Sequence, residues 1–152
     1  MKRLLLGIAL MLYSFTALSQ VNESYTDLGL SSRTKWKNIN EGNSKLFTYE
    51  EAIEAFGDKL PTKAQWMELV NECSWVWTGM GYKVVGPNGK SIVLPAWGCR
   101  NYGIVEYVGD CGLYWSFNPV DFDYAWIFAF DSKNKRLGTA LHGAGLSVRL
   151  VK

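Results

Sequence analysis

The side chains with chemical potential gather in the second half of the sequence. Two acids, Asp121 and Asp123, stand in the stretch FNPVDFDY (117–124), and the single histidine, His142, follows in ALHGAG. A pair of carboxylates is what glycoside hydrolysis uses, but these two flank aromatic residues in turn-like sequence, where acids commonly close turns. His142 has neither a nucleophile elbow nor an obvious partner beside it. The residues therefore predict no catalytic site.

The same stretch does not favour a metal. Asn118, Asp121 and Asp123 offer oxygen atoms at short spacing, yet calcium needs six or more oxygen ligands and no glycine-turned EF-hand loop is present. Zinc sites usually combine two Cys or His pairs, and a second pair beside Cys99 and Cys111 is lacking. We expect no metal and no other cofactor.

Aromatic and polar residues together favour a binding surface. Rigid rings beside Asn, Asp or Arg can stack on a sugar or peptide and hydrogen-bond to it at little entropic cost. Two loops, 117–124 and 133–143, are predicted to form this surface. The candidate ligand-binding residues are Phe117, Asn118, Asp121, Phe122, Asp123, Tyr124, Arg136 and His142. The alternative is that the three rings only cover the core.

The first residues have the pattern of a secretory signal. Lys2 and Arg3 precede an apolar run over 4–18, and small residues over 17–19 suit a signal peptidase. The run is shorter than the roughly 20 residues of a membrane-spanning helix, so we expect cleavage and no membrane insertion. The sequence predicts a signal segment over 1–19 and a single domain over 20–152, exported to the periplasm, the cell surface or the extracellular space.

The charge balance disfavours nucleic acid as a partner. The chain carries 16 basic and 14 acidic residues, and loss of Lys2 and Arg3 with the signal makes the counts equal. The remaining basic residues are scattered along the sequence, whereas electrostatic binding of nucleic acid needs a basic surplus or a basic stripe.

Three cysteines remain after residue 19, and we predict a disulfide between two of them. Cys99 and Cys111 lie in glycine-rich, loop-like sequence, while Cys73 falls on a predicted helix, and an oxidising compartment favours a pair. In the chain-entropy model such a bridge stabilises by roughly 3 kcal/mol. Cys73 is predicted to be a buried free thiol, which behaves as a small apolar group.

Two helices are predicted over 47–57 and 60–73. Thr48 with Glu51, and Thr62 with Gln65, have the spacing of capping boxes, and apolar residues then recur at helical intervals.

Strand patterns surround these helices. A short strand is predicted over 25–30 and a hairpin over 82–95, turning at Pro-Asn-Gly. The segment 124–130 is apolar on both faces and predicts a central strand, and 145–152 alternates as a half-buried antiparallel strand does. Together the elements predict an α+β domain with two helices packed on a small antiparallel sheet.

Several stretches, taken in order, resemble one family. They are YTDLGLSSRTKW, LPTKAQWMELVNECSWVWT, GYKVVGPNGKSIVLPAWGCRN, GLYWSF and LSVRLVK. They are similar to the "Fibrobacter succinogenes major paralogous domain" family of bacterial secreted proteins, from about Tyr25 to the C-terminus. The resemblance implies a C-type lectin-like fold with long loops, shared with formylglycine-generating enzymes, and an expectation of ligand or surface binding.

Three functions of different classes follow. The leading expectation is a secreted, non-catalytic binding module that recognises a carbohydrate, a peptide or a cell-surface protein. The second is a structural or assembly subunit of a surface adhesin or pilus tip. The third is an enzyme of the formylglycine-generating type, which the sequence disfavours because the terminal strand LSVRLVK contains no cysteine.

Overall fold

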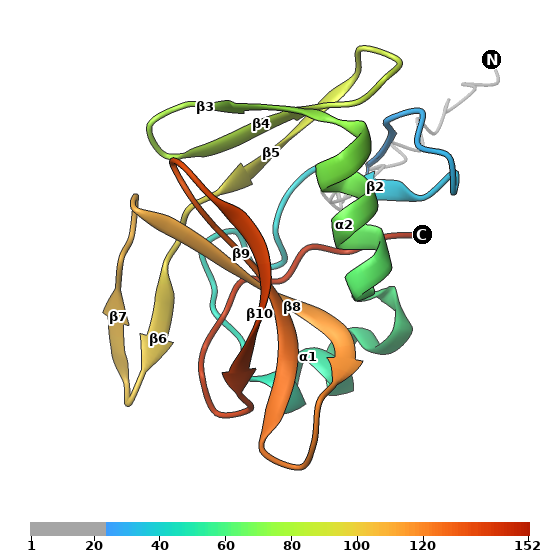
Figure 1. Cartoon of the computed structure of the whole chain (residues 1–152). Coiled ribbons are helices and arrows are strands. Elements are labelled where there is room, and N and C mark those ends of the chain that lie inside the picture. The colour runs from blue at the N-terminus through green and yellow to red at the C-terminus, as the bar shows by residue number, and fades with distance from the viewer. Residues whose placement is uncertain (1–23) are drawn as a thin grey trace, which may run out of the picture.

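The computed structural model describes residues 24–152, so the predicted signal segment 1–19 lies outside the described residues. Ten strands in this part of the chain form four antiparallel sheets (Figure 1). The central sheet has the order β10-β9-β8, and a second three-stranded sheet has the order β3-β4-β5. These strands are β8 (Cys111–Pro119), β9 (Tyr124–Asp131), β10 (Lys135–Leu141), β3 (Ser74–Trp77), β4 (Gly81–Val85) and β5 (Ser91–Pro95). The two-stranded sheets pair β1 (Tyr25–Asp27) with β2 (Lys35–Lys37), and β6 (Cys99–Asn101) with β7 (Ile104–Glu106).

The two predicted helices are confirmed, together with their caps. They are α1 (Tyr49–Phe56) and α2 (Lys63–Glu72), with a short 3-10 turn η1 (Gly57–Lys59) between them. Thr48 and Thr62 each close a complete capping box with the residue three positions on, which satisfies amide groups that the first helical turn leaves unpaired. Helix α2 runs along one side of the central sheet (Figure 1).

The predicted fold class is wrong. Strand and bridge residues make up 43% of the described chain and helical residues only 16%, so the fold is sheet-rich and not a two-helix α+β fold of the C-type lectin kind. The glycine-rich stretch 109–117 and the charged stretch 133–143 suggested loops. Most of both stretches instead forms β8 and β10, which pair with the two edges of the apolar strand β9. The aromatic residues in the centre of β8 favour a strand, and backbone pairing to buried β9 outweighs the glycine and charged residues of the two stretches.

Two strand predictions are confirmed. The segment 124–130 lies within β9, the middle strand of its sheet, and 82–95 forms the hairpin of β4 and β5. Strand β9 is buried on both faces, which explains why its sequence is apolar at almost every position.

The core lies on both faces of the central sheet. Phe128 and Phe130 of β9 belong to one cluster of buried side chains, whereas Ala125 and Ile127 belong to the other, because successive residues of a strand point to opposite faces. On the side of α2, the indole of Trp66 stacks on Phe128 with ring centroids 4.7 Å apart. The helix is thereby held to the sheet by aromatic packing.

The C-terminal segment differs from its predicted form. Every residue of 144–151 is buried, and the segment makes isolated bridges through Gly145, Leu146, Ser147 and Val151 instead of a regular strand. The alternation of polar and apolar residues predicted that one face of this segment would be exposed to solvent. Both faces are instead covered, and the polar side chain of Arg149 is satisfied inside the protein.

Candidate functional site

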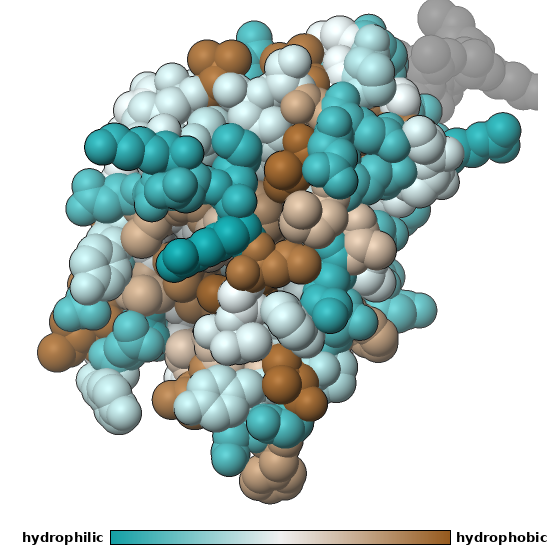
Figure 2. Space-filling model, viewed as in Figure 1, coloured by the Kyte–Doolittle hydropathy of each residue, from teal (hydrophilic) through white to brown (hydrophobic). Residues whose placement is uncertain are grey.

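A cleft of about 770 Å³ lies where three connections of the chain meet. They are the turn between β6 and β7, the turn between β8 and β9, and the segment after β10, and Figure 1 shows all three at the same end of the molecule, with α1 nearby. Figure 2 shows apolar and polar residues side by side over this end of the surface. A cleft of this size is typical of a small-molecule site.

Four of the eight predicted ligand-binding residues line this cleft: Asp121, Phe122, Asp123 and His142. These four residues come from both predicted loop regions. Parts of the two regions therefore share one surface, as expected. The contributing residues are confined to 121–123 and 141–144, because most of each region is strand.

The other four predicted residues lie elsewhere. The Asn118 side chain accepts a hydrogen bond from the Lys63 amide at 2.9 Å, which supports the start of α2. The Phe117 amide donates to the Pro61 carbonyl, Tyr124 begins β9 outside the cleft lining, and Arg136 lines a separate, smaller cavity.

Sequence reasoning missed four of the polar and aromatic residues that line the cleft, which are Glu50, Arg100, Asn101 and Tyr102. Two of these residues could have been identified from the sequence. Glu50 is in the first turn of a helix with a recognisable cap. Tyr102 precedes Gly103 at the tip of the β6–β7 hairpin, and an Asn-Tyr-Gly stretch between two short strands is typical of a turn.

Two aromatic rings stand out in the cleft because almost nothing covers them. Tyr102 is 99% exposed and Phe122 is 94% exposed, and neither ring has an aromatic neighbour among residues 24–152. The alternative that Phe122 covers the core is therefore wrong. A ring that folding leaves in water is free to contact a ligand.

His142 orders one wall of the cleft. Its Nδ1 lies 3.1 Å from Oε1 of Glu50, and its ring packs on Tyr49 with centroids 4.6 Å apart. Its backbone amide donates to the Asp123 carbonyl at 2.8 Å. Within residues 24–152 its Nε2 is buried and has no hydrogen-bond partner. His142 thus joins α1 to the β8–β9 turn and does not present a nitrogen to the cleft.

The two aspartates of the β8–β9 turn have different tasks. Asp121 accepts hydrogen bonds from the backbone amides of Asp123 and Tyr124 at 2.9 and 2.8 Å, so its carboxylate closes the turn. The carboxylate of Asp123 makes no hydrogen bond or ion pair within the described part of the chain. Asp123 is therefore the acid of this turn that can bind a ligand.

Arg100 contributes the positive charge among the residues that line the cleft. Its backbone amide and carbonyl pair with Gly145, and its Nη1 donates to the Leu46 carbonyl at 3.2 Å. A Cβ atom added to Gly145 would lie only 2.8 Å from the guanidinium carbon of Arg100. Arg100 can therefore occupy this position because Gly145 has no side chain.

All three cysteines are free thiols in this structure, so it does not contain the predicted disulfide between Cys99 and Cys111. Cys73 is half-buried at the C-cap of α2 and not buried as predicted. Burial, followed by the charges of Glu72 and Glu68, raises the pKa of Cys73 to about 11. Burial also raises the pKa values of Cys99 and Cys111. Reactive cysteines have lowered pKa values, so none of these thiols has the environment of a nucleophile.

Residues 24–152 contain neither a metal-binding cluster nor a membrane-spanning helix. Three or more His, Cys, Asp or Glu side chains nowhere come together as a metal-binding group in this range. Neither α1 nor α2 is long and apolar enough to cross a membrane.

Comparisons with family models, curated proteins and solved structures give no match to this chain. The resemblance to the "Fibrobacter succinogenes major paralogous domain" family therefore stays a prediction from the sequence.

Proposed function

We propose that this protein is an exported, non-catalytic binding protein whose cleft recognises a carbohydrate. The observation that carries the proposal is the pair of rings, Tyr102 and Phe122, which line one cleft and are almost completely exposed. Sugars present an apolar face of C–H groups that stacks on an aromatic ring, and hydroxyl groups that need hydrogen-bond partners beside it.

The polar lining of the cleft supplies such partners. The Asp123 carboxylate is unpaired among the described residues, and Glu50 remains 65% exposed beside His142. Arg100 and Asn101 add donors from the opposite hairpin. Because hydroxyls both donate and accept, a lining with carboxylates and a guanidinium can satisfy them from both sides.

The charge of the cleft favours neutral or amino sugars over acidic ones. Three carboxylates, those of Glu50, Asp121 and Asp123, face the single guanidinium of Arg100. An anionic sugar would enter against a net negative lining and would lose part of its hydration without sufficient compensation.

The thiols and His142 support the non-catalytic part of the proposal. The raised pKa values of Cys73, Cys99 and Cys111 disfavour the paired reactive cysteines that a formylglycine-generating enzyme needs. The buried Nε2 of His142 has no access to a substrate proton.

The test is a glycan array, followed by titration calorimetry with the best neutral glycan. We expect Phe122→Ala and Tyr102→Ala each to weaken binding about tenfold, since a stacked ring contributes about 1 kcal/mol or more. Tyr107→Ala is the matched control, because Tyr107 is an exposed ring of the same hairpin that does not line the cleft.

Two results contradict the proposal. One is an array on which no neutral or amino sugar binds, above all if a parallel peptide array gives a ligand. The other is an affinity for glycan that stays the same in Phe122→Ala and Tyr102→Ala but falls in Tyr107→Ala.

A further inference from the structure

Two free thiols, those of Cys99 and Cys111, lie near the base of the β6–β7 hairpin. Cys99 is the first residue of β6 and Cys111 is the first residue of β8. The two strands touch there, because the Gly98 amide donates to the Cys111 carbonyl at 2.8 Å and Gly98 forms a parallel bridge with Gly112.

The side chains of both cysteines line one cavity of about 230 Å³, together with Tyr107, Leu113 and Arg136. The pKa of Cys111 is raised by burial and, next in size, by the neighbouring Cys99, which also reflects their proximity. Cys73 lies after α2, outside the lining of this cavity.

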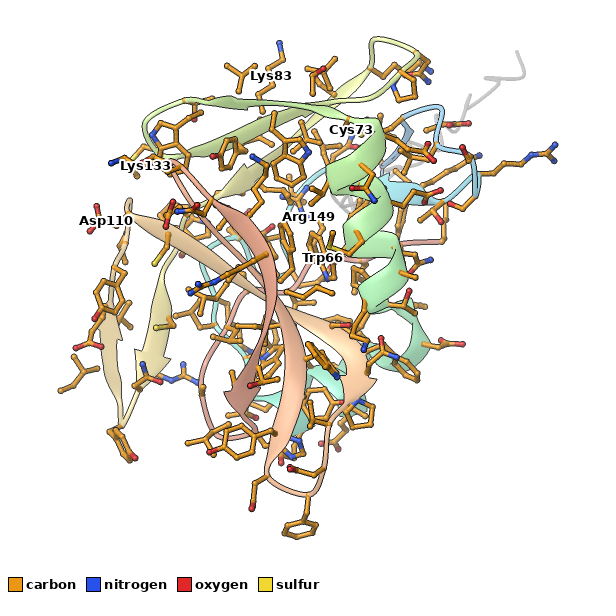
Figure 3. All side chains as sticks on the ribbon, viewed as in Figure 1. Trp66, Cys73, Lys83, Asp110, Lys133 and Arg149 are labelled. Carbon is orange, nitrogen blue, oxygen red and sulfur yellow. The ribbon has the colours of Figure 1, made fainter. Side chains whose placement is uncertain are left out.

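The chain between these thiols is the hairpin that carries one side of the cleft. All residues of 101–108 are exposed. Backbone hydrogen bonds to the rest of the described chain occur at its base, where Arg100 pairs with Gly145 and Gly109 donates to Ala96. Figure 3 shows Asp110, the neighbour of Cys111, at the end of the hairpin away from the β6–β7 turn. A hairpin with this little burial opens at low free energy.

We propose that Cys99 and Cys111 form a disulfide after export, and that this bond holds the hairpin so that Arg100, Asn101 and Tyr102 stay in place over the cleft. The bond forms between the two Sγ atoms by exchange with the disulfide of a thiol oxidant. Each thiol loses its proton, the pair gives up two electrons, and the oxidant leaves as a dithiol. The effect on the cleft rests on the proposed function, whereas the bond itself does not.

We expect formation of this disulfide by thiol–disulfide exchange to need a catalyst. The attacking group is a thiolate, and burial keeps both cysteines largely protonated at neutral pH. Once formed, the bridge would restrict the unfolded chain and oppose opening of the hairpin. A hairpin fixed in its binding geometry also lowers the entropic cost of ligand binding.

The first test counts thiols in the full chain purified from an oxidising compartment. After denaturation and alkylation without reductant, we expect one modified cysteine, Cys73, and one cross-linked peptide that contains Cys99 and Cys111. Cys73→Ser is the control and should retain the cross-link. Three alkylated cysteines after incubation with oxidised glutathione and a thiol–disulfide oxidoreductase, or a cross-link that includes Cys73, would overturn the proposal.

The second test separates the bond from its effect on the cleft. Reductant should lower the Tm of the wild type and of Cys73→Ser by about 10 °C, and should leave unchanged the Tm of the double variant Cys99→Ser, Cys111→Ser.

With a glycan found on the array, reduction should weaken binding about threefold or more. An unchanged affinity with the bond present overturns the coupling to the cleft. Absence of any glycan ligand refutes the proposed function, while the thiol count still decides on the bond.

Discussion

Arg100 and Gly145 show how a small residue can set the position of a charged one. The guanidinium passes directly over Gly145, and that close approach leaves no room for a Cβ atom. Gly143 also lines the cleft, but a Cβ atom there would meet nothing within 4 Å. The two glycines therefore form a matched pair for testing whether the position of Arg100 matters.

We predict that Gly145→Ala displaces Arg100, while Gly143→Ala leaves it in place. The crowded alanine should lower the free energy of unfolding by about 1–3 kcal/mol, and the open one by less than about 0.5 kcal/mol. Affinity for the cleft ligand should fall about tenfold in Gly145→Ala because Arg100 moves. Urea unfolding and calorimetry measure the two effects, and equal behaviour of the two variants would contradict this account.

Among the elements, the two helices offer a similar comparison. Both begin with a complete capping box, at Thr48 and at Thr62. Helix α1 supplies Glu50 to the cleft, whereas no residue of α2 lines it. The caps are therefore alike in local chemistry and different in their distance from the site.

We expect Thr48→Ala and Thr62→Ala each to cost about 1 kcal/mol of stability, as loss of an N-cap oxygen does. Only Thr48→Ala should also weaken ligand binding, because fraying of the first turn of α1 moves Glu50 away from His142. Thermal unfolding and calorimetry on both variants check this. A comparable loss of affinity in Thr62→Ala would mean that α1 has no special part in the cleft.

The elements also show what the sequence could and could not predict. The capping boxes correctly predicted both helices, and the apolar segment 124–130 correctly predicted a central strand, which is β9. Strand β10 was missed because its lysine and glycine residues have weak strand propensity. Strand β8 was missed because the glycines and the proline at its ends suggested a loop, although the aromatic residues in its centre favour a strand. The pairing of both strands with β9 is a contact that local patterns do not contain. The β6–β7 hairpin was missed although its Asn-Tyr-Gly turn is a local signal. Arg100, Asn101 and Tyr102 were missed with it, which are three of the eight polar and aromatic residues that line the cleft.

On the scale of the whole molecule, Arg149 joins parts of the chain that are far apart in sequence. Its guanidinium donates to the Asn40 side chain, the Lys37 carbonyl and the Val93 carbonyl of β5. Its side chain is completely buried, and Figure 3 labels it between α2 and the sheet of β3, β4 and β5 in that view. Burial lowers the pKa of Arg149 to about 10, so it remains charged at neutral pH. Its three partners are carbonyl or amide oxygens, so its charge is stabilised by dipoles.

We predict that Arg149→Met lowers the free energy of unfolding by about 3–5 kcal/mol, as removal of one partner from a buried charged network does. The loss arises because the buried oxygen of Asn40 and the partly buried carbonyl of Val93 would lose their donor. The control is Arg136→Met on the exposed side of β10, which should change stability by less than about 0.5 kcal/mol. Urea unfolding measures both, and a small effect of Arg149→Met would show that the interior tolerates an apolar replacement.

The burial of 144–151 also bears on the order in which the molecule can assemble. This segment forms bridges with partners spread from Trp36 to Tyr114, so neither face of the interior is complete until it is in place. A ribosome-bound or partly translocated chain that still lacks it would expose the apolar surface of both clusters. The two clusters therefore become complete only after this segment has been made. On the proposed route of export, a chaperone that holds unfolded polypeptide would bind this protein before its cleft has formed.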